Sequence, residues 1–171
     1  MKRICIIPCG AKKIWDVHPE AGSQPAGLVY LSPLHQRTKI YAQTFFSDWM
    51  ILSAKHGFLK ADDIVHENYD VAFGTPHKEQ LTREELSHQF HEKNLATYDE
   101  LVILGGKKYR KVMDPLLQPH QQANYPLAPY QGIGYMLQAL KRAAETKIEL
   151  SPHISCTHVS LQAGFSSSKR E

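Results

Sequence analysis

Short continuous hydrophobic runs recur along this sequence, and between them hydrophobic residues return with the spacing of a helix. The continuous runs predict buried strands at Ile4–Ile7, Trp49–Leu52 and Leu101–Leu104, with a weaker fourth strand at Tyr125–Ala128. Glycine, proline or serine follows soon after each of the first three runs and ends the pattern. Strands of this kind, hydrophobic throughout, are typical of a sheet that is covered on both faces.

The periodic stretches predict helices that alternate with these strands. We expect them from Pro33 to about Phe46, from Thr82 past Leu95, from Tyr109 to Leu116, and from Gly132 past Leu140. Ser32 can cap the first helix, and Pro33 suits its first helical position. Thr82 and Glu85 have the spacing of a capping box at the start of the second. The segment from about residue 14 to Leu31 and the one from Ser53 to Gly74 are predicted to be loops.

Alternating strands and helices predict an α/β fold, a three-layer sandwich around a mainly parallel four-stranded sheet. A chain of 171 residues fits one domain, which we assign to residues 1–147. The hydrophobic period is lost after Lys147, so residues 148–171 are predicted to be a flexible C-terminal extension.

The overall composition sets limits on the class of protein. The formal net charge of +3 permits contact with nucleic acid or nucleotides without demanding it. Three cysteines (Cys5, Cys9 and Cys156) form no secreted disulfide framework, and no segment resembles a signal peptide or a membrane span. The cytoplasm is the expected compartment, and no membrane partner is expected.

Ligands of parallel sheets bind beyond the carboxyl ends of the strands. The loops that matter are therefore Pro8–Lys13, Ser53–Asp70, Gly105–Tyr109 and Pro129–Gly134. This placement follows from the predicted strand order along the chain and depends on no family.

The loop after the first strand carries two candidates for chemistry. Cys9 is a nucleophile if neighbouring lysines and backbone amides lower the pKa of its thiol, and a small packing residue if they do not. Lys12 and Lys13 could hold a phosphate or could simply be solvated, and the family resemblance described below favours Lys13. Both interpretations of Cys9 stay open from the sequence alone.

The segment after the second strand supplies further polar groups. Ser53 follows the strand directly, Lys55 and His56 could meet a phosphate or a base edge, and Gly57 permits a tight turn. An equally simple interpretation of this stretch is a turn with two exposed cations.

An acidic stretch follows in the same long connection. Asp62 and Asp70 could orient water or stabilise a cationic transition state, and Tyr69 could stack on a base. Some of the carboxylates here are expected to be ordinary solvated residues.

Glycines mark the start of the third predicted helix. Gly105 and Gly106 precede Tyr109 and resemble an anion site, although the spacing is not that of a Walker motif. No Cys or His spacing predicts a metal site, and no cofactor is predicted.

Three segments together resemble a known group of proteins. Val29–Leu34, Ile51–Leu59 and Asn68–Val71 are similar to segments of the YaaA-like family of small bacterial and phage proteins. His56 stands where that family usually has Tyr, and Asn68 where it usually has Pro. The Pro8–Lys13 loop also resembles the Pro-Cys-Ser-x-Lys-Lys segment of the archaeosine synthase core domain.

The resemblance implies a fold and a class of substrate. It implies a sheet order of 2-1-3-4, similar to the uracil-DNA glycosylase fold, and a function around nucleobases. Tyr30 and Ser32 join the expected binding residues on this ground. Pro129–Gly132 has no His where a uracil glycosylase would carry its catalytic one, so that mechanism does not transfer intact.

Three functions remain open from the sequence. The first is a nucleobase-acting enzyme that cleaves an N-glycosidic bond or modifies a base, with DNA favoured over RNA as its partner. Asp70, Asp62, Lys13 and Cys9 are its candidate catalytic residues. The second is a non-catalytic DNA-binding stress-response protein, and the third is a binding protein for a free nucleotide or nucleobase.

Overall fold

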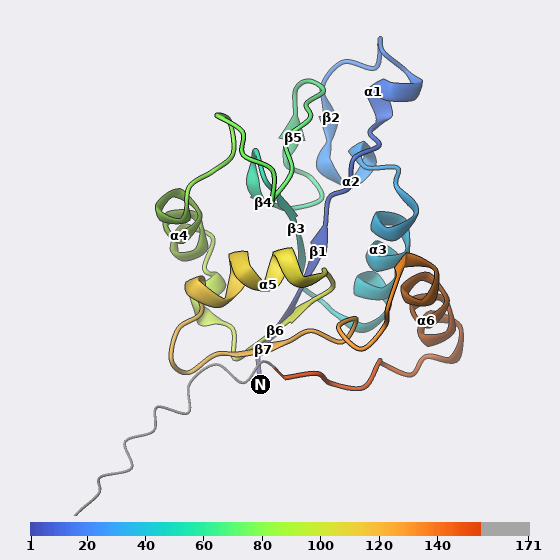
Figure 1. Ribbon diagram of the computed structural model, residues 1–171, viewed down its shortest axis with the longest axis vertical. Helices are drawn as coiled ribbons and strands as arrows, with labels where there is room; N and C mark the ends of the chain where they lie inside the picture. The colour runs from blue at the N-terminus through green and yellow to red at the C-terminus, as the bar shows by residue number, and fades with distance from the viewer. Residues whose placement is uncertain (155–171) are drawn as a thin grey trace, which may run out of the picture.

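A computed structural model, which describes residues 1–154, has the expected α/β architecture (Figure 1). Its main sheet has the strand order β4-β3-β1-β6-β7. The strands of this sheet are β1 (Arg3–Pro8), β3 (Trp49–Ser53), β4 (Gly57–Leu59), β6 (Glu100–Ile103) and β7 (Gln122–Asn124). The strands β2 (Gln24–Pro25) and β5 (Ile64–Val65) form a separate antiparallel pair.

Helices cover both faces of the main sheet, which gives three layers. Figure 1 shows α3 and α6 on one side of the strands and α4 and α5 on the other. The helices are α1 (Ile14–Val17), α2 (Ala26–Val29), α3 (Pro33–Phe45), α4 (Arg83–Glu92), α5 (Lys107–Met113) and α6 (Ile133–Thr146), with short 3-10 turns at Leu95–Thr97 and Asp114–Leu116. None of the helices described in residues 1–154 has the length and apolar character needed to cross a bilayer.

The central strand β1 explains the continuous hydrophobic run near the N-terminus. It pairs in parallel with β3 on one side and β6 on the other, so that Cys5 lies opposite both Trp49 and Val102. The side chains of residues 4–7 are at most 1% exposed, because helices pack on both faces. Burial on both faces requires apolar residues at successive positions, which is the observed pattern.

The prediction of a four-stranded sheet was wrong in the number of strands. The parallel strands run β3-β1-β6-β7, which is the expected order 2-1-3-4, but β4 adds a fifth, antiparallel strand to β3. The sequence pattern predicts a loop from Ser53 to Gly74, because β4 has only three residues and shows no visible period. The ladder with β3, from Ile51↔Leu59 to Ser53↔Gly57, supplies the order that the local pattern lacks.

The last parallel strand also lies elsewhere than predicted. β7 is Gln122–Asn124, whereas Tyr125–Ala128 leads into a turn after it, with Tyr125, Pro126 and Leu127 buried and Ala128 exposed. The strand pairs with β6 in the register Leu101↔Ala123, although Ala123 is its only hydrophobic residue. Pairing with the buried strand β6 therefore makes this segment a strand, although its own composition does not favour one.

Neither edge of the sheet is left bare. At the β4 edge, the Gln89 side chain of α4 accepts from Phe58 N and donates to His56 O, and Lys93 Nζ also donates to Phe58 O. At the β7 edge, residues 153 and 154 meet the end of the strand: Ile154 forms an antiparallel bridge with Asn124, and Tyr125 N donates to His153 O at 2.8 Å.

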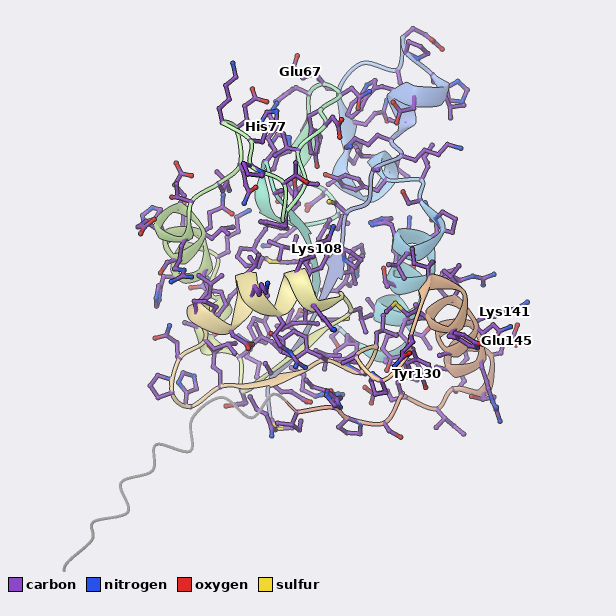
Figure 2. The ribbon with its side chains drawn as sticks, in the orientation of Figure 1. Glu67, His77, Lys108, Tyr130, Lys141 and Glu145 are labelled. Carbon is purple, nitrogen blue, oxygen red and sulfur yellow. The ribbon has the colours of Figure 1, made fainter. Side chains whose placement is uncertain are left out.

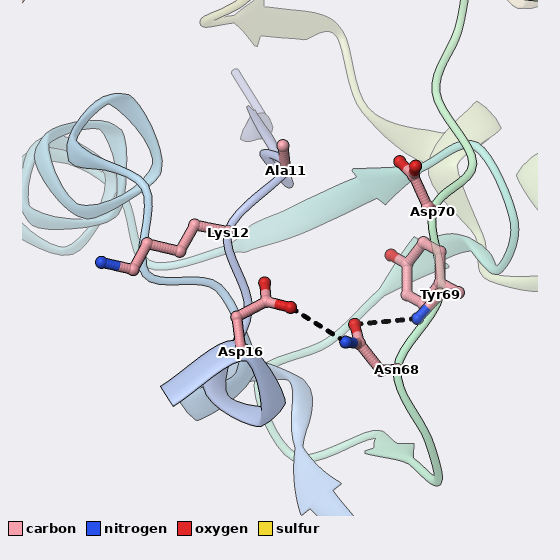
Figure 3. A pocket seen from close by; sticks show the side chains of 6 residues that line it. All are labelled: Ala11, Lys12, Asp16, Asn68, Tyr69 and Asp70. Atoms are coloured by element: carbon pink, nitrogen blue, oxygen red, sulfur yellow. Dashed lines mark hydrogen bonds between the residues drawn. The ribbon is translucent and has the colours of Figure 1, made fainter. Parts of the chain in front are cut away.

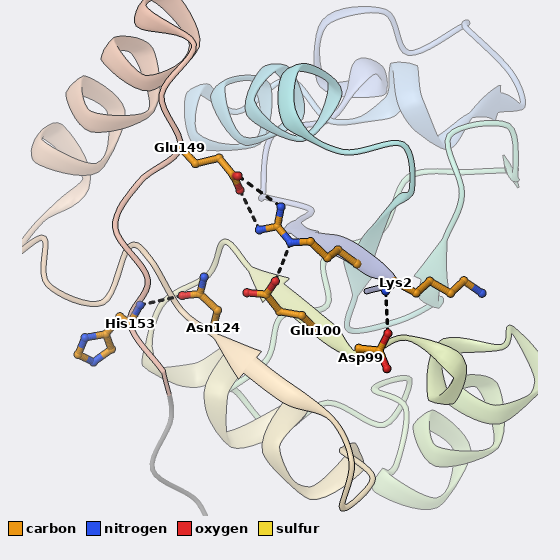
Figure 4. A network of polar contacts seen from close by, with 7 residues as sticks. Lys2, Asp99, Glu100, Asn124, Glu149 and His153 are labelled. Carbon is orange, nitrogen blue, oxygen red and sulfur yellow. Dashed lines mark hydrogen bonds and ion pairs between the residues drawn. The ribbon is translucent and has the colours of Figure 1, made fainter.

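A polar network fastens this C-terminal stretch (Figure 4). The Arg3 guanidinium bonds Glu100 and, through both terminal nitrogens, Glu149. The Asn124 side chain accepts from His153 N at 2.8 Å. The described part of the predicted extension is thus joined to the domain, while Cys156 and the predicted flexible end, within 155–171, lie outside the described residues.

Candidate functional site

The strand order places a crevice at the carboxyl end of β1. From β1 the chain passes through α3 to β3 on one side, and it then crosses back to β6 on the other. Connections that leave a sheet in opposite directions open a gap between adjacent strands, and ligands of α/β proteins bind there. The loop that begins at Cys9 lies at this switch point.

A small pocket of about 110 Å³ occupies the crevice. Its walls come from the loop after β1, the end of β3, the first turn of α5 and the segment 70–73. They consist of Cys9, Gly10, Ala11, Lys13, Ala54, Asp70, Val71, Ala72, Phe73, Lys108 and Tyr109. Pockets for drug-sized ligands are roughly 300–1,000 Å³, so this one suits a single ring or a smaller group. We call it the ring pocket.

An open groove of about 640 Å³ adjoins the ring pocket (Figure 3). It is lined by Ala11, Lys12, Asp16, Asn68, Tyr69 and Asp70. Ala11 and Asp70 line both spaces, so they mark the junction between them. The Asp70 residue is exposed. A carboxylate therefore stands where a group in the ring pocket would be joined to a group in the groove.

Lys13 forms the floor beneath this junction and is only 3% exposed. Its backbone N–H donates to Asp16 Oδ2 at 2.8 Å, and its Nζ donates to Ala11 O at 2.9 Å. The same Nζ lies 4.4 Å from the centre of the Tyr69 ring, a cation–π contact. Burial lowers the pKa of Lys13, with Cys9, Asp16 and Asp70 acting in the opposite direction. A buried ammonium of this kind gives up its proton more readily than a solvated one.

A chain of buried hydroxyl groups supports Tyr69 from below. Its Oη lies 2.5 Å from Tyr30 Oη and 2.8 Å from Ser53 Oγ. Ser53 Oγ also accepts from His56 N, which closes the turn after β3. Burial raises the pKa of Tyr30 to about 12 and raises that of Tyr69 further. These hydroxyls therefore stay protonated at neutral pH and fix the Tyr69 ring in place.

Lys55 and His56 contact the same ring from the β3 side. Lys55 Nζ lies 5.6 Å from the centre of the Tyr69 ring, and it pairs with Glu79 at 3.8 Å. The His56 ring meets Tyr69 edge-on at 4.9 Å. Its Nε2 is buried and has no hydrogen-bond partner among the described residues. Burial lowers the pKa of His56, so its ring is neutral at pH 7.

His35 is a buried neighbour of the site that was not among the predicted site residues. Its Nδ1 lies 2.8 Å from Pro8 O, and its ring stands 5.2 Å from that of Tyr30. Its Nε2 is also buried without a partner in the part of the chain that the structure covers. Burial lowers the pKa of His35 to about 4. In the sequence, its only distinction is its place in the first turn of the predicted helix that begins at Pro33.

Cys9 lies on the wall of the ring pocket and is 8% exposed. Burial raises the pKa of its thiol, even though Lys13 and Lys108 act to lower it. Tyr109 contacts it from α5, and burial together with Cys9 raises the pKa of that phenol. A thiol with a raised pKa is a poor nucleophile at neutral pH, which favours the packing interpretation of Cys9.

Two glycines allow close approaches around the ring pocket. Gly10 has φ +103°, and a Cβ there would lie 2.8 Å from Ser32 Oγ, the atom that accepts from Lys12 N. A Cβ at Gly105 would lie 2.5 Å from the ring of Tyr109. The first glycine seats the loop on α3, and the second lets α5 pack against β6.

The structure brings most of the predicted site residues together. Cys9, Lys13, Asp70 and Tyr109 line the ring pocket, and the remaining members stand directly behind or beside it: Tyr30, Ser32, Ser53, Lys55, His56 and Tyr69. Sequence reasoning missed Asp16, Asn68, Phe73 and Lys108, whose positions depend on how distant loops meet.

Four predicted residues lie elsewhere. Asp62 is exposed in the turn between β4 and β5 and lines neither the ring pocket nor the groove. Gly57 has φ +74° in β4, where a Cβ would collide with the Gln89 side chain. Gly105 and Gly106 line a different cavity on the other side of the first turn of α5. Within residues 1–154, no group of three or more His, Cys, Asp or Glu side chains could hold a metal ion.

Fold and site together define an α/β protein with a crevice at the switch point of its sheet. The chain belongs to a family of unknown function, DUF6884, whose model matches residues 4–142. It is 61% identical over 150 residues to the uncharacterized protein YfjM of Bacillus subtilis strain 168, a match that covers 88% of this chain and all of the relative. No solved structure matches the chain.

Proposed function

We propose that this protein is an enzyme that acts on a nucleobase and cleaves its N-glycosidic bond. One observation carries the proposal: Asp70 lines both the ring pocket and the open groove. A base in the ring pocket and its sugar in the groove would place the glycosidic bond beside this carboxylate.

The chemistry of the walls suits this arrangement. Tyr109 and Phe73 meet edge to face, with ring centres 5.8 Å apart, and offer an aromatic wall to a planar ring. Asp70 would stabilise the positive charge that develops on the sugar, or orient the attacking water. Water adds to the anomeric carbon as the carbon–nitrogen bond breaks. Of its two protons, one leaves through the carboxylate and the other remains on the new hydroxyl.

Lys13 is the proposed partner of the departing base. Its buried ammonium lies in the wall of the ring pocket, and its lowered pKa favours transfer of a proton to the base nitrogen. The order of the parallel strands is that expected for a glycosylase-like sheet, and the loop resemblance to YaaA-like proteins and to the archaeosine synthase core points to the same substrates. Both support the proposal, with DNA favoured over RNA.

The test is release of free base from oligonucleotides that carry damaged or modified bases, read as alkali-labile abasic sites. Asp70→Asn should lower cleavage at least about a hundredfold, the usual size of a positioned acid–base or charge contribution. Asp62→Asn is the matched control, because Asp62 is an exposed carboxylate on the same long segment and should leave cleavage unchanged. The proposal fails if no substrate is cleaved, or if the two variants behave alike.

The small volume of the ring pocket also favours a second candidate, binding of a free nucleobase or nucleotide without cleavage. A ligand that binds the folded state alone raises the melting temperature. Thermal shifts across a panel of bases, nucleosides and nucleotides, together with no cleavage of any of them, would favour this function over the first.

A further inference from the structure

A second cavity, of about 680 Å³, lies on the other side of the first turn of α5. It is lined by Gly105, Gly106, Lys107, Arg110, Tyr125, Ala128, Tyr130, Gln131, Gly132, Met136 and His153. Neighbouring residues of α5 thus face different spaces: Lys108 and Tyr109 the ring pocket, Lys107 and Arg110 the cavity. Figure 2 shows Lys108 on one side of α5, and Tyr130 on the other in the loop before α6.

The cavity and the groove beside the ring pocket differ in charge. The groove carries the carboxylates of Asp16 and Asp70 together with the cation of Lys12, and Lys13 and Lys108 line the ring pocket. The titratable side chains that line the cavity are Lys107, Arg110 and His153, apart from the tyrosines, and none of the lining residues is an acid. The groove therefore suits a developing cation, whereas the cavity suits an anion.

Arg110 is the best placed group for such an anion. Its guanidinium lies 4.5 Å from the centre of the Tyr125 ring, which fixes the plane of the fork. Its Nη2 is buried and has no hydrogen-bond partner within residues 1–154. Buried donors in folded proteins are nearly always satisfied, so this guanidinium has a donor left for an acceptor that enters beside it.

The size and the remaining walls indicate more than a lone phosphate. A cavity of 680 Å³ falls in the range that holds ligands as large as a nucleotide. Tyr130 is half-buried at its rim and offers a phenol face on which a base can stack. Lys107 is exposed and adds a second cation beside Gly106.

We propose that this cavity is a second subsite, which binds the phosphate and base of the nucleotide next to the one whose base enters the ring pocket. The substrate is then a single strand of nucleic acid that crosses the first turn of α5, and not a free nucleoside. This inference rests on the proposed function, because it assigns the ring pocket to a nucleobase.

Fluorescence anisotropy of a labelled single-stranded DNA decamer, and of the RNA decamer of the same sequence, tests the subsite. Unlabelled deoxynucleoside monophosphates serve as competitors. Lys107→Glu and Arg110→Gln should each weaken decamer binding by roughly tenfold, and each should lower the slope of log K against log salt by about one. The strand bound more tightly, DNA or RNA, identifies the natural substrate.

Lys111→Glu is the matched control. It makes the same charge change on an exposed residue of α5 that lines neither space, so the salt slope should stay close to that of the wild type. Arg110 packs on a buried ring, and a melting curve will show whether Arg110→Gln folds. Lys107 is exposed, so its variant keeps the test decisive if the other unfolds.

The outcomes separate the two proposals. If Lys107→Glu and Lys111→Glu have equal effects, or if monophosphates bind as tightly as the decamer, the second subsite is wrong and the ring pocket keeps its role. If neither nucleosides nor strands bind, and none is cleaved, the subsite falls together with the proposed function.

Discussion

The hydroxyl oxygens of Tyr30 and Tyr69 lie 2.5 Å apart in the interior, although the two residues are 39 positions apart in the chain. One precedes α3, and the other follows the β5 strand. Their contact ties the segment after β5, which contains Asp70, to Tyr30, and Tyr30 in turn bridges Lys13. The position of the proposed catalytic carboxylate therefore depends on a hydrogen bond behind it.

Replacing Tyr69 with Phe should destabilise the fold by about 1–3 kcal/mol, since it takes a partner from two buried hydroxyls, those of Tyr30 and Ser53. Chemical denaturation measures the change. Tyr98→Phe is the control, because it removes an exposed hydrogen bond to Asp48 and should cost less than 1 kcal/mol or so. Equal losses in the two variants would mean that the buried hydroxyl chain contributes nothing special.

The glycine pair before α5 gives a prediction with a built-in control. Gly105→Ala should destabilise by roughly 1–3 kcal/mol, because its Cβ would lie 2.5 Å from the Tyr109 ring. Gly106→Ala should change stability by less than about 1 kcal/mol, because nothing described lies within 4 Å of the added atom. Thermal or urea unfolding compares them. A stable Gly105→Ala variant would show that Tyr109 can move, and with it a wall of the ring pocket.

Stability should fall in mild acid because of His35. Burial lowers its folded-state pKa to about 4, below the unfolded value of about 6.5. Between these two pKa values His35 binds a proton more tightly in the unfolded chain than in the folded protein. The contribution of His35 to the free energy of unfolding is therefore complete above about pH 6.5 and is lost as the pH falls toward 4. The full loss is about 3 kcal/mol. His56 acts in the same direction.

Urea unfolding between pH 4 and 7 measures this dependence. The His35→Gln variant should have a flatter profile than the wild type, whatever its absolute stability. The His88→Gln variant should keep the wild-type slope, because His88 is exposed on α4 beside Glu92. Parallel profiles for wild type and His35→Gln would contradict the burial argument.

Cys9 should react slowly with iodoacetamide in the folded protein. Burial raises the pKa of its thiol, so at pH 8 the thiolate is scarcer than in an unfolded chain. We expect alkylation at least about tenfold slower than in urea, measured peptide by peptide with mass spectrometry. Cys9→Ala should also retain base-release activity. Rapid labelling of the native protein, or loss of activity in Cys9→Ala, would restore the nucleophile hypothesis.

The central strands could be predicted from the sequence because their burial is continuous. Trp49–Ser53 and Glu100–Ile103 lie beside β1. The first contains the whole predicted run Trp49–Leu52, and the second contains all of Leu101–Leu104 except Leu104. Gln122–Asn124 and Gly57–Leu59 could not be found in this way, because each is short and takes its order from a neighbouring strand. The hydrophobic pattern of a sequence reflects which residues are buried. A short edge strand forms because it pairs with a neighbouring strand, so this pattern does not reveal it.

The site divides along the same line. Cys9 and Lys13 lie in the loop after the first predicted strand and Ser53 directly follows the second, so the rule for parallel sheets located them. Asp16 and Asn68 were missed because their pairing, 3.0 Å across the groove, joins two segments that the sequence pattern describes only as loops. Asp62 and Asp70 looked alike in the sequence, and only the course of the chain after β5 separates them.

The covering of both edges of the main sheet affects the tendency of this protein to aggregate at high concentration. A bare strand offers its backbone to any other chain, and this is a common route to aggregation. Here the Gln89 side chain bonds the backbone of the β4 edge, and His153 and Ile154 cover the end of β7 on the other side. A chain cut before His153 is therefore expected to expose the end of β7 to pairing with another chain.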